Sequence, residues 1–284
     1  MLPILPRFPV NAARPQDAAA LTGLAGMAIK PDWHTPPGVG SLMSTRQGGV
    51  SAAPWESLNL GALVGDDPRA VAENRARWAQ ALNAQPVWLN QVHGTHVVRI
   101  GAGDVGDAGD AGDAGREPTT ADAAWTDQPG VACTVMVADC LPVLFASRDG
   151  RAVAAAHAGW RGLAGGVLEA TLAALQHGAG VEPSAVIAWL GPCIGPRAFE
   201  VGADVLQAFG ALNGADARFV SRPLADGSPR WLADLQALAL ARLAAVGVQQ
   251  VSSSGLCTWQ GGSRFFSFRR NGRTGRLAAS VWLR

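Results

Sequence analysis

Two short apolar runs in the middle of the chain, Leu141–Ala146 and Ala152–Ala156, are separated by the five residues SRDGR. An Asp-Gly pair between apolar runs is a strong signal for a tight β-hairpin turn, because both residues tolerate the backbone angles that such a turn requires. We therefore predict an antiparallel hairpin with Asp149 and Gly150 at its turn. The chain is 48% apolar. It can therefore bury a large core around this hairpin, and global disorder is excluded.

The register of the hairpin follows from its turn. With Asp149 and Gly150 as the central residues, the numbers of facing residues sum to 299 (149 + 150), so Pro142 lies opposite His157. Side chains alternate along a strand, which places Cys140 and His157 on one face as diagonal neighbours, ~7–8 Å apart at Cα. A thiolate and an imidazole at this spacing can bind one metal ion or each other. Since Pro142 has no N–H for the ladder, its strand is expected at a sheet edge or bulged at this point.

Further strands and helices alternate along the chain without a regular βαβ rhythm. Apolar periodicity and capping residues predict helices at Pro68–Asn83, Leu163–Gln176 and Leu232–Val246. Apolar runs predict strands at Pro86–Gln91, Val97–Ile100, Val131–Val137, Val186–Leu190, Val248–Ser254, Ser263–Phe268 and Leu277–Leu283. The pattern indicates an α+β fold, an α/β layered sandwich built as a single mixed-sheet domain with helices on the outside.

Two segments lie outside this pattern. Residues 1–38 are rich in Pro and Ala and are expected to form a loose N-terminal extension with a short helix at Gln16–Leu21, so that the domain covers residues 39–284. Residues 101–118 contain a repeated Gly-Asp-Ala triplet. They match G-x-G-x-x-G by chance, because no helix follows, and we interpret them as a low-complexity loop insertion.

Composition excludes several classes of protein. The 23 basic and 22 acidic side chains nearly cancel, which argues against a nucleic-acid-binding protein. No apolar run approaches the ~20 residues of a membrane helix, and no signal peptide is evident, so no membrane is expected as a partner. The four cysteines are too few and too dispersed for a disulfide scaffold, which favours the cytoplasm. We expect a monomer or homodimer that acts on a small molecule.

A third candidate ligand joins the Cys140–His157 pair. His93 lies in the sequence Gln91-Val92-His93-Gly94, between two predicted strands. Two histidines and one cysteine without a fourth protein ligand are typical of a catalytic zinc site, which keeps one position open for water or substrate. His96 is a rival ligand three residues further on.

Two further cysteines, Cys193 and Cys133, have other interpretations. Cys193 lies in Gly191-Pro192-Cys193-Ile194-Gly195, which imitates the G-x-nucleophile-x-G elbow of hydrolases, although no clear helix follows. Cys133 lies within an apolar run and is interpreted as a buried core thiol.

Arginines in glycine-rich loops indicate an anion pocket. Arg46 lies in Thr45-Arg46-Gln47-Gly48-Gly49, Arg161 lies between Gly159 and Gly162, and Arg270 follows Phe268 and Arg269. Guanidinium groups bind phosphate or carboxylate through two parallel hydrogen bonds. Charged residues are only 16% of the chain, so several arginines in such loops favour an anion-binding pocket.

Several ordered motifs together resemble one known family. They are NQVHG (90–94), ADCLP (138–142), AHAGWRG (156–162), GP with IG and FEVG (191–202) and FSFRR (266–270), with TR and GGVS (45–51) and LNLG (58–61) before them. They occur here in the order of the laccase-domain polyphenol oxidase family, whose members are described as purine nucleoside phosphorylases and some as peptidoglycan editing factors. The resemblance covers roughly residues 39–284. It departs from the family at the insertion before Thr120-Ala121-Asp122-Ala123, where the family carries a similar acidic motif.

The resemblance implies a zinc-dependent purine nucleoside phosphorylase. Such enzymes act on adenosine, inosine and S-methyl-5'-thioadenosine and also deaminate adenosine. The implied metal ligands are His93, Cys140 and His157, and the implied cofactor is Zn²⁺, with copper as the other candidate. We expect Cys140, His157 and Asp139 to be the catalytic residues, with Asp139 as a proton carrier or as an orienting group. The candidates for substrate and phosphate binding are Arg46, Asn59, Gln91, Arg161, Glu200 and Arg270.

Two alternative functions remain open at this point. Cys140 and His157 could act as a thiol hydrolase dyad that cuts an amide in a peptidoglycan precursor. Copper-dependent polyphenol oxidation is the other alternative, although the chain lacks the several histidine-rich clusters that multicopper sites need.

Overall fold

Two sheets packed face to face form the centre of the protein. The computed structural model describes residues 26–105, 118–212 and 216–284. The six-stranded sheet has the order β13-β9-β7-β8-β5-β4, with bounds Gln250–Ser253, Val186–Leu190, Leu141–Ser147, Val153–Ala158, Ala123–Thr126 and Val97–Arg99. The five-stranded sheet has the order β1-β2-β14-β6-β3, with bounds Ala28–Ile29, Val39–Ser44, Leu277–Leu283, Val131–Val137 and Gln85–Val87.

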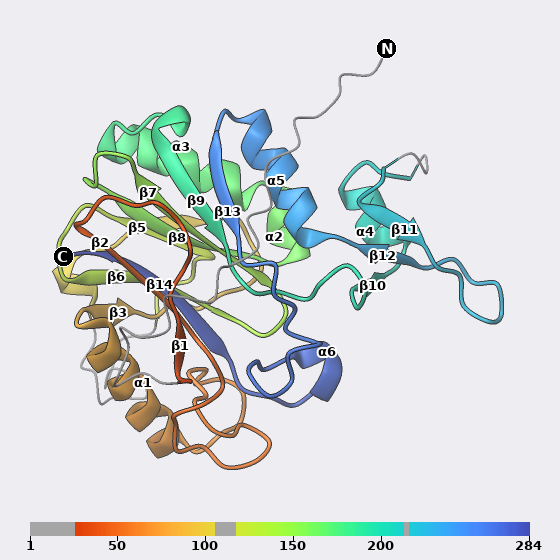
Figure 1. Cartoon of the computed structure of the whole chain (residues 1–284), viewed down its shortest axis with the longest axis horizontal. Helices are drawn as coiled ribbons and strands as arrows, with labels where there is room; N and C mark the ends of the chain where they lie inside the picture. Colours follow the sequence, from red (N-terminus) through yellow and green to blue (C-terminus); the bar gives the residue numbers. More distant parts are fainter. Residues whose placement is uncertain (1–25, 106–117, 213–215) are drawn as a thin grey trace.

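Helices cover the outer faces of both sheets (Figure 1). Trp78 and Leu82 of α1 (Pro68–Leu82) pack against Leu42 and Trp282 on the five-stranded sheet. The six-stranded sheet is covered by α2 (Trp160–Gly165), α3 (Val167–Ala179) and α5 (Leu235–Ala245), whose leucines share one apolar core with β7 and β8. Alternate residues of β6, β7 and β8 fill the space between the sheets. The predicted α+β sandwich with outer helices is therefore confirmed.

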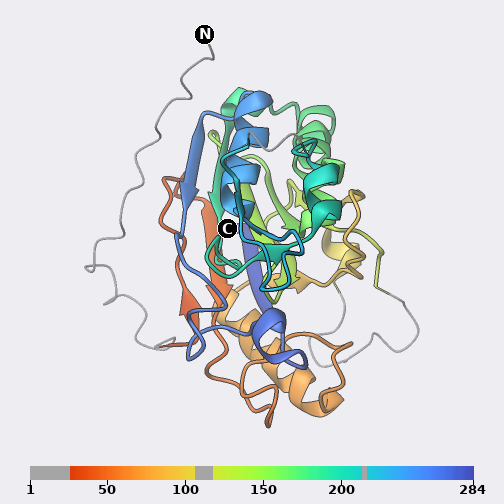
Figure 2. The same ribbon diagram turned by 90° about the vertical axis from the view of Figure 1, so that its right-hand side faces the viewer.

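A smaller sheet lies at the side of this sandwich. It has the order β10-β12-β11, with bounds Glu200–Val201, Trp231–Ala233 and Phe219–Ser221. With α4 (Ala203–Ala208) it projects from the main body in Figure 1, and in Figure 2 it faces the viewer. Short helices complete the described chain: η2 (Ala102–Asp104), η3 (Pro183–Ala185) and α6 (Phe268–Asn271). Within the described residues, no helix has the length and apolar character needed to cross a bilayer.

The predicted hairpin is present in the predicted register. Pro142 pairs with His157, and Leu141 pairs with Ala158. The expectation of an edge or bulged strand at Pro142 is wrong, because β7 lies between β8 and β9. The carbonyl of Pro142 accepts a hydrogen bond from Gly191 N, at 2.9 Å, on the β9 side. Since N and C=O of one strand residue point the same way, the missing N–H also faces this side, one position beyond the last β7–β9 pair. The carbonyl of Gly191, which that N–H would face, accepts from Gln236 Nε2 at 3.2 Å instead.

Four predicted elements differ from the structure. The strand expected at Pro86–Gln91 is shorter, since β3 covers only Gln85–Val87. The helix expected at Leu163–Gln176 is two helices, α2 and α3, because Gly166 adopts φ +100° between them. The helix expected from Leu232 begins at Leu235, where the side chain of Asp234 caps it, and the preceding residues form β12.

The strand expected at Ser263–Phe268 is wrong. The amide of Phe265 donates to Gly261 O within a turn, and the side chain of Ser267 caps α6. The apolar signal came instead from Phe265 and Phe266, which are buried in the core between the sheets.

The two segments that the sequence set apart are described only in part. The expected helix at Gln16–Leu21 and residues 106–117 of the insertion lie outside the described residues. The described end of the expected N-terminal extension belongs to the sandwich: β1 pairs with β2, and Trp33 is buried and donates to Ser41 Oγ. A helix at Pro68 begins as expected, with the side chain of Asp67 capping it.

Candidate metal centre

Three side chains from distant parts of the chain converge where the two sheets meet. His93 lies in the loop after β3, Cys140 lies in the three-residue crossing from β6 to β7, and His157 lies on β8. One ligand atom from each, two imidazole nitrogens and one sulfur, all lie within 4.8 Å of one another. Cys140 Sγ is 3.7 Å from His93 Nε2, and the two imidazole rings meet edge to face with centroids 4.7 Å apart. The chain therefore presents a group that could hold a metal ion.

A buried carboxylate orients both histidines. Asp122 Oδ1 lies 2.8 Å from His157 Nδ1 and accepts from the amide of His93 at 2.9 Å. Its other oxygen accepts from the amides of Gly94 and Val92. The hydrogen bond at Nδ1 leaves Nε2 of His157 for a metal, the arrangement that carboxylate–histidine pairs impose at many metal sites. Asp122 was not among the expected site residues, although it lies in the acidic block at 120–123.

The electrostatics of the cluster favour an ionised thiol. Burial opposes ionisation of Cys140, but the positive charge and hydrogen bond of His157, with a smaller contribution from His93, lower the pKa of this thiol to about 6. Burial also disfavours the charged imidazole, yet the thiolate of Cys140 and the carboxylate of Asp122 raise the pKa of His157. In the same way, hydrogen bonds from His157 and from backbone amides outweigh burial and lower the pKa of Asp122.

The donor set and its packing fit a zinc-sized ion. Bond lengths at tetrahedral zinc place a sulfur and a nitrogen ligand about 3.6 Å apart, close to the 3.7 Å between Cys140 Sγ and His93 Nε2. A Cβ at Gly159 would lie 2.7 Å from His93 Cδ2 and 3.1 Å from Cys140 Sγ. Only glycine at 159 therefore leaves the two ligands this close.

Two residues of the centre are held in an unusual backbone conformation. His93 has φ +62° and Asp139 has φ +99°, a region that residues with a Cβ rarely occupy. Such strain persists only where the surroundings enforce it, and it gathers at functional sites. The carboxylate of Asp139 supplies part of that support, because it accepts from Thr258 Oγ1 at 2.6 Å and from the amide of Arg269 at 2.7 Å. Both oxygens of Asp139 are thus engaged beside Cys140.

A cavity of about 970 Å³ adjoins the cluster and includes all three candidate ligands in its wall. The apolar part of the wall comes from Trp88, Met136, Phe268 and several aliphatic side chains. The polar part includes Asn90, Gln91, Thr119, Arg75, Arg99 and Arg276. A mostly apolar wall with a few polar groups is typical of a small-molecule site.

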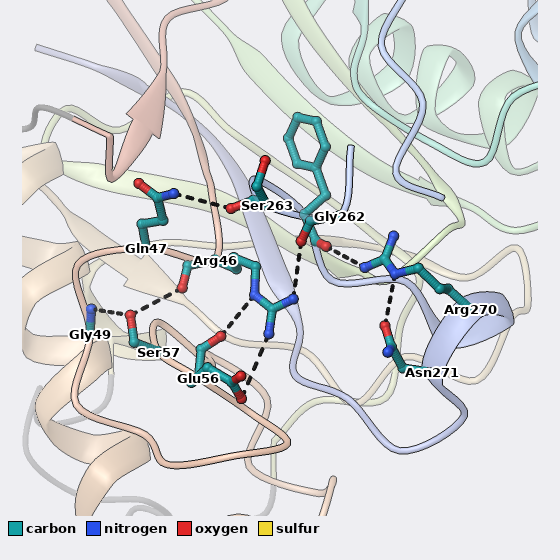
Figure 3. Close-up of polar contacts among 10 residues, drawn as sticks. Arg46, Gln47, Gly49, Glu56, Ser57, Gly262, Ser263, Arg270 and Asn271 are labelled. Carbon is teal, nitrogen blue, oxygen red and sulfur yellow. Dashed lines mark hydrogen bonds and ion pairs between the residues drawn. The ribbon is translucent and has the colours of Figure 1, made fainter. Parts of the chain in front are cut away.

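Two of the expected phosphate-binding arginines are engaged in holding loops together. Arg46 donates from Nε to Glu56 O and from Nη1 to Gly262 O (Figure 3). Arg270 donates to three backbone carbonyls, those of Thr258, Trp259 and Phe265. Neither arginine is part of the cavity wall. Their geometry is that of loop clamps.

The other four expected substrate-binding residues have different surroundings. Asn59 is buried and bonds to the backbone of Gly61 and Arg276 and to Asp66. Arg161 is exposed in the first turn of α2, with its guanidinium 4.2 Å from the Trp160 ring centroid.

The last two are Glu200 and Gln91. Glu200 lies on β10, and its carbonyl accepts from Arg269. Gln91 bonds to both the N–H and the C=O of Met136 and is the one expected substrate-binding residue in the cavity wall.

The remaining candidates lie away from the cluster. Cys193 is buried, and burial together with nearby negative charge raises its pKa, which disfavours a nucleophilic role. Burial likewise raises the pKa of Cys133, which is a core thiol as expected. His96 contributes its backbone carbonyl, which accepts from the amides of Asp122 and Ala123.

Comparison with known proteins gives consistent matches. Residues 40–284 match the family model described as multi-copper polyphenol oxidoreductase laccase. A Pseudomonas aeruginosa protein named purine nucleoside phosphorylase is 51% identical over 255 residues, covering 90% of this chain and 98% of its own length. The Escherichia coli protein named purine nucleoside phosphorylase YfiH is 47% identical over 261 residues, with the same coverage of 90% and 98%.

A solved structure shares the fold. The Neisseria meningitidis protein NMB0706 superimposes with a TM-score of 0.79 at 46% sequence identity, over 90% of this chain and 98% of the other.

Proposed function

The chain belongs to the family described as multi-copper polyphenol oxidoreductase laccase, and on this premise we propose that it is a zinc-dependent purine nucleoside phosphorylase. The proposed substrates are adenosine, inosine and S-methyl-5'-thioadenosine, with adenosine deamination as a second activity. The names of the relatives from P. aeruginosa and E. coli support a phosphorylase. The observation that carries the proposal is the His93–Cys140–His157 group opening into a cavity.

The cavity has a size that suits a nucleoside. Ligand sites for small molecules occupy roughly 300–1,000 Å³, and this one measures about 970 Å³. Its apolar surfaces, Trp88 and Met136 among them, can cover a purine ring, while Asn90 and Gln91 offer amide edges nearby. A nucleoside and a phosphate ion can therefore be enclosed together beside the metal ligands.

Phosphorolysis places defined demands on this site. As the C1'–N9 bond breaks, positive charge develops on the ribose and negative charge on the purine, so the site must hold phosphate close to C1'. A zinc ion held by His93, Cys140 and His157 would supply Lewis-acid chemistry. Asp122 orients the two histidines. Of the two roles expected for Asp139, the engagement of both its oxygens supports the orienting one.

One observation favours the hydrolase alternative. The lowered pKa of Cys140 and the raised pKa of His157 describe a thiolate–imidazolium pair, which is the resting state of many thiol hydrolases. The copper oxidase alternative has less support. The described part of the chain contains one group of three or more side chains that could hold a metal ion, whereas multicopper oxidation needs several.

A reducing compartment, the cytoplasm, is proposed as the site of action. The four cysteines are free, and the proposed metal centre requires Cys140 as a thiolate. The oligomeric state, monomer or homodimer, stays a prediction that size-exclusion chromatography with light scattering can test.

The test combines product analysis and metal analysis on one sample. Purified protein is incubated with adenosine with and without phosphate, and the products are separated by chromatography while bound zinc and copper are quantified. Adenine and ribose 1-phosphate that appear only with phosphate support the proposal, and inosine supports the deaminase activity. Adenosine left unchanged by zinc-loaded protein in the presence of phosphate would contradict it.

Two variants connect the activity to the metal centre. Cys140→Ala and His157→Ala should each abolish phosphorolysis while the protein stays folded. Each should also reduce the amount of zinc bound to the protein to less than half of the wild-type amount. His177→Ala is the matched control, because His177 is an exposed histidine on α3 outside the cavity. Full activity in Cys140→Ala would show that the chemistry takes place elsewhere.

A further inference from the structure

Three arginines that the sequence did not mark lie in the wall of the cavity, and one of them, Arg99, forms an ion pair with Asp127. The other two are Arg75 and Arg276. Arg75 is on α1, and Arg276 directly precedes β14. Both arginines are hydrogen-bonded to the backbone of Leu60. Arg75 Nε donates to Leu60 O at 3.0 Å, and Leu60 N donates to Arg276 O at 3.1 Å. One loop residue thus holds the two arginines on the same side of the cavity.

Both guanidinium groups keep donors that protein acceptors do not use. The described hydrogen bonds employ only Nε of Arg75, and at the guanidinium of Arg276 only Nη1, which donates to Thr274 O and Gly275 O at 3.2 Å each. Neither arginine takes part in an ion pair with a carboxylate of the described residues. Unmatched guanidinium forks in a cavity wall are suited to bind an oxyanion through paired hydrogen bonds.

The surroundings fix both side chains before any ligand arrives. The guanidinium of Arg75 stacks on Trp88, with Cζ 4.3 Å from the ring centroid. The stem of Arg276 lies against Gly61, where a Cβ would approach Cγ of Arg276 to 2.6 Å. Asn59 Oδ1 accepts from the amide of Arg276 at 2.8 Å. Because the arginines are held in place, little side-chain freedom is lost when an anion binds.

Burial of the two guanidinium groups makes the binding of an anion beside them more favourable. Burial lowers the pKa of Arg75 to about 10, which reflects the difficulty of keeping a charge in this environment. Burial also lowers the pKa of Arg276, and the negative charges of Cys140 and Asp139 act in the opposite direction. Arg276 is therefore electrostatically coupled to the candidate metal centre. An anion on its free donors would lie in the same cavity as Cys140 and His157.

We propose that Arg75 and Arg276 form the phosphate subsite of this cavity. The assignment rests on the proposed phosphorylase function. It replaces Arg46, Arg161 and Arg270, which lie outside the cavity wall. In the reaction, an oxygen of monohydrogen phosphate forms a bond to C1' of the ribose. The C1'–N9 bond breaks with its electron pair on the purine, and the proton of the phosphate ends on the purine. Arg75 and Arg276 hold the attacking phosphate and balance its charge.

Kinetics separate this subsite from a purely structural role. The variants are Arg75→Gln and Arg276→Gln, with Arg69→Gln as the matched control because Arg69 is an exposed arginine on the same helix outside the cavity. A lost charge-assisted hydrogen bond corresponds to about a tenfold to hundredfold loss of affinity. We expect each subsite variant to raise the KM for phosphate by at least tenfold and to change the KM for adenosine and the zinc content by less than twofold. Arg69→Gln should leave all three unchanged.

Two further measurements keep the proposal testable. If a glutamine variant fails to fold, Arg75→Lys or Arg276→Lys, which keeps the charge and loses the planar fork, should still raise the KM for phosphate severalfold. Calorimetric titration of zinc-loaded protein with inorganic phosphate measures the subsite without turnover. Heat of binding in the wild type that is lost in Arg276→Gln would support the subsite even if the protein proved not to be a phosphorylase.

Other results would overturn the assignment. They are an unchanged KM for phosphate in both subsite variants, or phosphate titration curves that match the wild type. If only Arg161→Gln raised the KM for phosphate, the phosphate-binding role would belong to Arg161, the exposed arginine of α2.

Discussion

Asp122 offers the sharpest test of how the metal centre is organised. Its carboxylate accepts hydrogen bonds from His157 Nδ1, at 2.8 Å, and from the backbone amides of Val92, His93 and Gly94 at 3.2, 2.9 and 2.7 Å. Asp122→Asn keeps the shape of the side chain and replaces one acceptor oxygen with an NH₂ donor. In one orientation of the new amide, its NH₂ group faces His157 Nδ1 and the backbone N–H of His93. In the other orientation, the NH₂ group faces the backbone N–H groups of Val92 and Gly94.

The size of the effect follows from this count. Hydrogen bonds to a charged acceptor contribute about 1.5–3 kcal/mol each. Two of the four are lost, which gives a decrease of about 3–6 kcal/mol in the free energy of unfolding. If His157 changes tautomer, only one is lost and the decrease is about 1.5–3 kcal/mol. A changed tautomer would place a proton on Nε2, the nitrogen left for the metal. Loss of such an orienting carboxylate weakens metal affinity by about 10- to 100-fold.

The assay measures zinc affinity by competition with a chromophoric chelator and measures stability by urea unfolding of the metal-free protein. Asp127→Asn is the control, because Asp127 forms an exposed ion pair with Arg99, and such pairs contribute about 0–1 kcal/mol. Zinc affinity of Asp122→Asn within twofold of the wild type would refute the view that Asp122 positions the histidines.

Three further predictions concern the packing and chemistry of the same region. Gly159→Ala places a Cβ 2.7 Å from His93 Cδ2 and should weaken zinc binding by about tenfold or more, with an unchanged circular dichroism spectrum. The control Gly38→Ala, whose Cβ has no atom within 4 Å, should leave zinc binding unchanged. In metal-free protein, alkylation of Cys140 by iodoacetamide should be half-maximal near pH 6, since the thiolate dominates above its pKa of about 6, and added zinc should block it; a midpoint near pH 8.5 would be that of an ordinary thiol. Arg270→Gln, which loses donors to three carbonyls, should lower the free energy of unfolding by about 2 kcal/mol in denaturant titrations and leave the KM for phosphate unchanged; a selective rise in that KM would contradict its role as a loop clamp.

Local chemistry determined much of the fold. The strands at Val131–Val137, Val186–Leu190 and Leu277–Leu283 have the predicted bounds, because each is a continuous apolar run that ends at loop residues. The pairing of Pro142 with His157 followed from the Asp-Gly turn alone. The strand prediction at Ser263–Phe268 failed because Phe265 and Phe266, which have high strand propensity, are buried although the backbone there forms a turn.

The sequence by itself determined the hairpin and its register, which brings Cys140, directly before β7, close to His157, since turn geometry is a short-range property. Only the tertiary structure decided which charged groups surround that pair. Asp122 is 35 residues from His157, and nothing in the helical pattern around Arg75 distinguishes a cavity residue from a surface one. Such contacts arise from how distant elements pack, because the energy that joins them is realised only when both sheets and α1 are assembled.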